Sequence, residues 1–214
     1  HHLLLTHEHF GHIDGLGLFG RETLASRGIN LHVSDAMHQL VNQTPQWNLM
    51  VQQGVFDVST FVHGVQLFNA ENLVIEAVQI PHRDELSDMH AFIVRGPNKS
   101  LLFLPDHDTW EETLAVHSAS SIREWLSSLQ IDIALLDGTF WSEDELGGRD
   151  QSKVPHPPVL QTLNMLGNRE DGDPDVYFTH LNHTNPLYDA EGEQMKQVLS
   201  LGWKVAQQGQ RFTL

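Results

Sequence analysis

The sequence of 214 residues contains no cysteine. Disulfide bonds and thiolate metal ligands are therefore both excluded. Any metal site must be built from histidine, aspartate and glutamate, a donor set that suits zinc, iron or manganese. A chain without cysteine also fits a reducing compartment, and we expect a cytoplasmic protein.

Basic residues are scarce: 12 Lys and Arg stand against 28 Asp and Glu, for a net charge of −16. A surface that follows nucleic-acid phosphates needs clustered basic side chains, whereas Lys99, Lys153 and Lys196 stand far apart in the sequence. No apolar run approaches the roughly 20 residues of a membrane-spanning helix, and no secretory pattern opens the sequence. We therefore expect neither nucleic acid nor membrane as a partner.

Histidine is abundant, with 15 residues. His1 and His2 resemble the end of a purification tag and are set aside. The stretch THEHFGH follows the apolar run 3–5 and holds His7, His9 and His12. Residues i and i+2 of a strand face the same side, and a turn into a helix at Gly11 brings the third histidine toward the other two. This pattern favours a metal site over a polar surface loop.

Ligand-type residues also follow four apolar stretches that read as strands. They are His82 after 73–80, Asp106 and Asp108 after 101–104, Asp137 after 131–136, and His180 and His183 after 176–178. Each alone is equally well explained as a turn cap or a packed side chain. Because sites in α/β proteins gather at strand ends, we expect them to converge on one edge.

Strand and helix signals alternate along the sequence, and strand signals dominate residues 55–103. The pattern predicts a layered α/β protein with mixed sheets, formed as a single domain over residues 1–214. Helices are expected at 13–27, 36–43, 47–53, 111–130 with a break at 118–121, 158–166 and 190–201, with terminal strands at 203–206 and 211–214. Residues 147–158 and 168–175 are expected to be loops.

The histidine motif, followed by Ile-Asp-Gly-Leu, resembles the His-x-His-x-Asp-His signature of the metallo-β-lactamase superfamily. The stretches IPHRDELSD, LLFLPDHDTWE, LLDGTFWSEDEL, VPHPPV and THLNHTNPL follow in that order and resemble the branch of the pyrroloquinoline quinone biosynthesis B proteins. The resemblance runs from His7 nearly to Leu214. It implies an αββα sandwich with mixed sheets that binds one or two divalent metal ions, with zinc favoured and iron or manganese as alternatives.

The resemblance also implies the ligands. His7, His9 and His82 match the first metal site, and Asp106 matches the carboxylate that bridges two ions. His12 and His180 match the second site, where His183 is an alternative. His180 is favoured because it directly ends its strand.

Two departures from the superfamily pattern stand out. Position 11 is glycine, where the signature has an aspartate that binds the second ion, so a site with one ion is a serious alternative; Asp14 lies too far along the expected helix to replace it. The motif also begins at residue 7, where relatives carry several earlier strands. We expect N-terminal strands to be missing or the first sheet to be incomplete, with edges that a second copy of the chain would cover.

The predicted activity is that of a metal-dependent hydrolase acting on a small molecule: an ester, amide, lactone or phosphodiester. A bound cation lowers the pKa of water toward about 7 and polarises an oxygen of the substrate. The candidate catalytic residues are Asp106, Asp108, Asp137 and His156, although His156 equally fits a plain surface histidine. One alternative is an iron-dependent oxidative enzyme in or near pyrroloquinoline quinone biosynthesis. A second is a metal-binding protein without catalysis.

Overall fold

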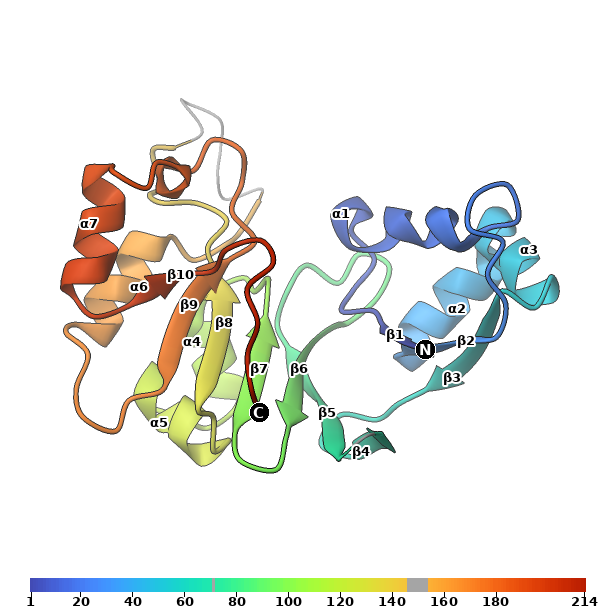
Figure 1. Cartoon of the computed structure of the whole chain (residues 1–214), viewed down its shortest axis with the longest axis horizontal. Coiled ribbons are helices and arrows are strands. Elements are labelled where there is room, and N and C mark those ends of the chain that lie inside the picture. The colour runs from blue at the N-terminus through green and yellow to red at the C-terminus, as the bar shows by residue number, and fades with distance from the viewer. Residues whose placement is uncertain (71, 146–153) are drawn as a thin grey trace.

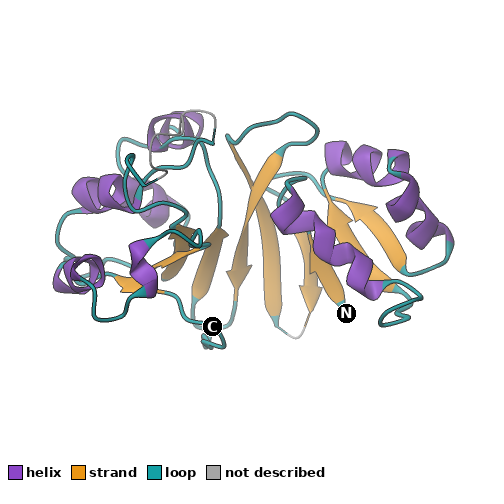
Figure 2. Cartoon of the chain, turned by 90° about the horizontal axis from the view of Figure 1, so that it is seen from above, coloured by secondary structure: helices purple, strands orange, loops and turns teal. Residues whose placement is uncertain are grey.

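The computed structural model describes residues 1–70, 72–145 and 154–214, which form two β-sheets with helices on their outer sides (Figures 1 and 2). The first sheet is parallel and has the order β1-β2-β3. Its strands are β1 (His2–Leu4), β2 (Ile29–Val33) and β3 (Phe56–Thr60). Because parallel strands need a crossover, two helices connect β2 to β3: α2 (Asp35–Gln43) and α3 (Pro45–Gln52).

The second sheet has seven strands in the order β10-β9-β8-β7-β6-β5-β4. They are β4 (Gln66–Ala70), β5 (Leu73–Ile80), β6 (Met89–Arg95), β7 (Ser100–Leu104), β8 (Ile133–Asp137), β9 (Asp175–Thr179) and β10 (Lys204–Val205). Strands β4 to β7 pair antiparallel, and β7 to β10 pair parallel. Strand β5 therefore runs in the same direction as β7, β8, β9 and β10.

The outer face of the second sheet is covered by helices whose apolar side chains join its core. These helices are α4 (Trp110–Val116), α5 (Ile122–Ser128), α6 (Val159–Leu166) and α7 (Glu193–Ser200), with a short 3-10 helix, η3 (Pro186–Tyr188), before α7. Trp110, Trp125 and Trp203 are fully buried in this core. The first sheet has its own core against α2 and α3, including Leu31, Met37 and Val41.

The two sheets pack against each other through a third apolar cluster. Phe61, Ile75 and Phe92 form it, and Leu4 of β1 joins it from the first sheet. Helix, sheet, sheet and helix thus follow one another across the molecule, as Figure 2 shows. The predicted αββα sandwich with mixed sheets is confirmed.

Two element predictions are wrong. Instead of a helix over 13–27, the chain forms the single turn α1 (Phe10–Ile13) and the 3-10 helix η1 (Asp14–Phe19), followed by turns. Four glycines between positions 11 and 20 explain this, because glycine disfavours a regular α-helix. Residues 211–214 are not a strand; Phe212 instead packs on Tyr177. The predicted break at 118–121 is confirmed, because α4 ends at Val116 and α5 begins at Ile122.

Most of the predicted loop 147–158 lies outside the described residues, and its last part, 154–158, is irregular. Among the helices of the described ranges, none is long and apolar enough to cross a membrane.

Candidate metal centre

The carboxyl ends of β5, β7, β8 and β9 lie at one edge of the large sheet, since these strands share one direction. His82 follows β5, Asp106 follows β7, Asp137 ends β8, and His180 follows β9. The topology therefore explains why residues nearly a hundred positions apart in sequence meet in space.

The histidine turn reaches the same edge from the other sheet. After β1, the backbone N–H of Leu5 still donates to the carbonyl of His32 at 3.2 Å, and the carbonyl of Thr6 accepts from His90 of β6 at 3.0 Å. The turn is thereby tied to both sheets. His9 then caps α1, and the N–H of His12 donates to the carbonyl of His9 at 2.8 Å. This first helical turn brings His12 back beside His7, with ring centroids 4.3 Å apart.

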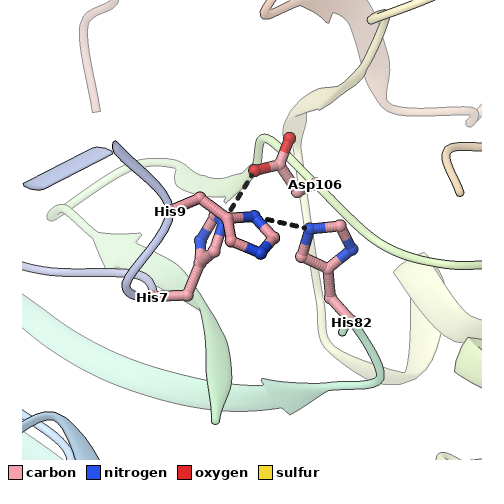
Figure 3. A group of neighbouring side chains, drawn as sticks. All are labelled: His7, His9, His82 and Asp106. Atoms are coloured by element: carbon pink, nitrogen blue, oxygen red, sulfur yellow. Dashed lines mark hydrogen bonds and ion pairs between the residues drawn. The ribbon is translucent and has the colours of Figure 1, made fainter. Parts of the chain in front are cut away.

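A first group consists of His7, His9, His82 and Asp106 (Figure 3). One ligand atom from each residue lies within 4.8 Å of the other three. Nδ1 of His9 lies 2.9 Å from Nε2 of His7 and 3.3 Å from Nε2 of His82. Nε2 of His7 lies 3.2 Å from Oδ2 of Asp106. Apart from His9, all these side chains are buried.

A second group shares Asp106 with the first. Nε2 of His12 lies 2.9 Å from Oδ2 of Asp106, and Nδ1 of His180 lies 2.9 Å from Oδ1. His180 adopts a left-handed backbone conformation with φ of 58°, which is uncommon outside glycine and costs about 1 kcal/mol or more. This conformation follows directly after β9 and places the imidazole against Asp106.

Hydrogen bonds from neighbouring side chains orient the ligand nitrogens. Nδ1 of His82 lies 2.9 Å from Oδ1 of Asp108. A carboxylate only accepts, so this nitrogen carries the proton, and the lone pair of neutral His82 lies on Nε2, toward the group. The Thr6 hydroxyl lies 3.1 Å from Nδ1 of His7. On the outer side, Nη2 of Arg83 lies 3.0 Å from Nε2 of His9.

A third array lies beside Asp106 and is centred on the buried Asp137. Its Oδ2 lies 2.8 Å from Nδ1 of His156, and its Oδ1 accepts from the backbone N–H and the hydroxyl of Thr139 at 2.9 and 2.7 Å. The same hydroxyl lies 2.9 Å from Nδ1 of His180. The ring of His156 lies 5.4 Å from that of His82, so this histidine faces the ligand groups.

The charges of these residues suit a cation. Burial lowers the pKa of His7 to about 2, against the opposing pull of Asp106, and burial likewise lowers the pKa of His82, so both imidazoles are neutral. Burial alone would raise the pKa of Asp106, but hydrogen bonds from His12 and His180 hold it well below its usual range. His7 and His82 beside the ionised Asp106 thus have the protonation states that bind a divalent metal. At His180, burial alone would lower the pKa, but the hydrogen bond to Asp106 and its charge raise it.

The crowding of nitrogens supports the same interpretation. Nδ1 of His9 faces both His7 and His82, yet it has only one hydrogen or one lone pair and cannot satisfy both neighbours. A cation between the three rings removes this conflict, because each nitrogen then donates a lone pair to it. For His9 this requires the hydrogen on Nε2, so Arg83, which only donates, must turn away from that nitrogen. Three imidazoles and one carboxylate are a donor set that zinc and iron(II) accept.

The family comparison agrees with this geometry. A model of the family described as "Beta-lactamase superfamily domain" matches residues 1–180. The chain belongs to this superfamily. The buried groups of histidine and aspartate side chains are consistent with metal binding at this site.

The chain is similar in sequence to proteins named coenzyme PQQ synthesis protein B. The protein from Acinetobacter baumannii strain SDF is 23% identical over 188 residues, which cover 81% of this chain and 59% of the relative. The chain thus spans about three fifths of that relative's length. Zinc-bound PqqB from Methylobacterium extorquens superposes with a TM-score of 0.74 at 18% identity, covering 100% of this chain and 71% of the other. The predicted resemblance to this branch is confirmed.

A diphosphatase of the PhnP family also shares the superfamily fold, with a TM-score of 0.60 and 14% identity over 98% of this chain and 68% of the other. At this level of identity the likeness concerns the fold.

The structure gathers most of the residues predicted for the site. His7, His9, His12, His82, Asp106 and His180 lie in the two ligand groups, and Asp108, Asp137 and His156 lie directly beside them. His183 is exposed and lies in none of the ligand groups found among the described residues. The geometry therefore favours His180 over His183 as a ligand of the second group. Asp14 lines a cavity beside His9 and lies in none of the ligand groups of the described residues.

Sequence reasoning missed the residues that hold these groups in place. Thr139, Thr6 and Arg83 contact the imidazoles. The only indication of them in the sequence was that each stands next to or near a predicted site residue. Glu8, inside the histidine motif, is buried and accepts from the Ser87 hydroxyl at 2.5 Å. It therefore ties the histidine turn to the segment after His82.

Proposed function

We propose that this chain is a metal-dependent hydrolase that acts on a small molecule through activated water. The observation that carries the proposal is the buried set of His7, His9, His82 and Asp106, joined through Asp106 to His12 and His180. Such a set binds one divalent ion at the first group, with a second position beside it. When bound, the cation supplies a lowered pKa for water and polarises the substrate oxygen.

The residues around the ligands have separate tasks. Asp106 contributes negative charge to both groups, and its burial keeps that charge free from screening by water. Asp108 fixes the ring of His82. These contacts hold the ligands in one geometry before any substrate arrives, which is what a preorganised site requires.

We assign proton transfer to the leaving group to His156. Nδ1 of His156 donates to Asp137, which leaves Nε2 as the atom that exchanges a proton. Burial alone would lower the pKa of His156, but the hydrogen bond and the charge of Asp137 raise it above its ordinary value. The contact with Asp137 holds the ring in place and leaves Nε2 as the exchanging atom, which suits a general acid.

The substrate is proposed to be an ester, amide, lactone or phosphodiester of low molecular weight. The net charge of −16 disfavours binding of a long polyanion. Zinc is our preferred ion, since a zinc-bound PqqB shares the fold, with iron or manganese as alternatives.

The test is hydrolysis of 4-nitrophenyl acetate, a γ-lactone and bis(4-nitrophenyl) phosphate by the zinc-loaded protein. His156→Gln should lower kcat by about 10²–10⁴-fold on a cleaved substrate while the bound metal stays unchanged. His63→Gln is the matched control, because His63 is exposed and lies in none of the ligand groups of the described residues. Equal rates for the two variants would contradict the role of His156.

An oxidative enzyme is the second candidate. The relatives named as PQQ synthesis proteins favour it, and histidines with one carboxylate suit non-haem iron(II) and dioxygen. Oxygen consumption by the iron-loaded protein, together with no turnover of any hydrolysable substrate, would replace the hydrolase proposal with this one.

A further inference from the structure

A cavity of about 700 Å³ opens beside His9, between α1, the helices α2 and α3, and the segment that follows His82. Its volume falls within the roughly 300–1,000 Å³ of small-molecule sites. His9 belongs to both places, because its Nδ1 faces the metal ligands while its Nε2 faces Arg83, which lines the cavity. A molecule whose reacting group lies at the ligands can therefore extend past His9 into the cavity.

The wall of this cavity is mainly apolar. Leu40, Trp47 and Met50 line it from α2 and α3. Phe10 and Leu86 line it from two other segments, although 78% and 64% of these residues are exposed to solvent. Two large apolar side chains that face one hollow and contribute little to the core are typical of a ligand-binding site. Together with Trp47 they offer apolar surface to a ligand.

Carboxylates outnumber basic side chains among the charged residues that line the cavity. Glu8, Asp14 and Glu85 line it together with a single cation, Arg83, so carboxylates outnumber guanidinium groups by three to one. Arg83 lies 3.2 Å from Glu85, which partly neutralises its charge. A negatively charged ligand would be repelled by the carboxylates of Glu8, Asp14 and Glu85.

The rim carrying Leu86 is held by the histidine motif itself. The backbone N–H of Leu86 donates to Oε1 of Glu8 at 3.2 Å, and the Ser87 hydroxyl donates to Oε2. The shape of the cavity is thereby fixed by the same turn that carries His7 and His9.

We propose that this cavity binds the uncharged apolar portion of the substrate, an aromatic or branched alkyl group of an ester, amide or lactone. The identity of the reacting group rests on the proposed hydrolase function, whereas binding of the apolar group in the cavity does not require catalysis. The proposal narrows the substrate to neutral carbonyl compounds and disfavours phosphodiesters.

The first experiment measures equilibrium binding by fluorescence of two probes with the same ring, 2-naphthalenemethanol and 2-naphthalenesulfonate. The protein should bind the neutral probe about 10-fold more tightly than the anion. The double variant Phe10→Ala/Leu86→Ala should weaken binding of the neutral probe about 10-fold through lost apolar contact. The control Leu18→Ala/Leu24→Ala removes two residues with exposures of 61% and 67% that do not line the cavity, and it should bind like the unaltered protein.

The second experiment follows hydrolysis of 2-naphthyl acetate. The rim variant should raise KM about 10-fold with kcat within about twofold. Failure to bind the neutral probe, or equal binding and KM in the rim and control variants, overturns the cavity proposal. Rim-dependent binding without hydrolysis of any ester or lactone supports the cavity and contradicts only the hydrolase function.

Discussion

The hydrogen bond between His82 and Asp108 gives a sharp test of how the metal ligands are held. Asp108→Ala removes the acceptor 2.9 Å from Nδ1 of His82 and leaves every proposed ligand in place. The ring of His82 then loses the partner that fixes its tautomer and orientation. Removing such a partner typically weakens metal affinity by 10–100-fold, which corresponds to about 1.4–2.7 kcal/mol.

The assay is a competitive zinc titration against a chromophoric chelator at constant pH. Asp84→Ala is the matched control, because Asp84 is an exposed carboxylate on the segment that follows His82 and its removal changes the net charge equally. Asp108→Asn retains an acceptor oxygen and should fall between Asp108→Ala and the unaltered protein. Zinc affinities that agree within twofold for Asp108→Ala and Asp84→Ala would refute the orienting role.

Three further predictions concern the second metal position, the ion pair between Arg123 of α5 and Asp173, and the turn after β8. Gly11→Asp should raise bound zinc toward two ions per chain by metal analysis, because a Cβ at Gly11 meets no heavy atom within 4 Å and the new carboxylate would add a ligand for the second ion. An unchanged zinc content would contradict the idea that glycine at this position removes a ligand. Arg123→Ala should lower the free energy of unfolding by about 1–3 kcal/mol in urea, because Asp173 and the carbonyl of Leu166 lose the hydrogen bonds from its guanidinium. Burial would raise the pKa of Asp173, but the Arg123 hydrogen bond lowers it. The stabilisation by this ion pair is therefore fully present above the unfolded-state pKa of about 3.9 and is lost as the pH falls through the lower pKa of folded Asp173. The gap between the two proteins should therefore narrow in acid, and a gap independent of pH would contradict the ion pair. Gly138→Ala should destabilise by about 1–3 kcal/mol in the same assay, because its Cβ would lie 2.7 Å from the carbonyl of Thr179; unchanged stability would contradict this close approach.

The strand-end residues were predictable because sheet geometry is regular. Apolar runs indicate where strands end, and strands that share a direction place those ends at one edge. His82, Asp106, Asp137 and His180 therefore meet as expected. Local pattern also placed His12 beside His7, because a tight turn is the only short route from β1 into α1.

Other features depend on tertiary structure and could not be predicted from local pattern. The position of His180 directly after its strand favoured it over His183, but the sequence did not indicate the left-handed backbone conformation that places its imidazole against Asp106. The expected helix over 13–27 failed because the apolar periodicity of this segment was outweighed by its glycines. The cavity beside His9 uses residues of α2 and α3, whose spacing in the sequence reads simply as core.

The most direct test of the account is metal analysis of protein prepared without added metal and without an affinity tag. We expect one or two divalent ions per chain, and their loss from the double variant His7→Ala/His9→Ala. A chain that carries no divalent ion and binds none on titration, or a double variant that retains its full metal content, would contradict the central claim.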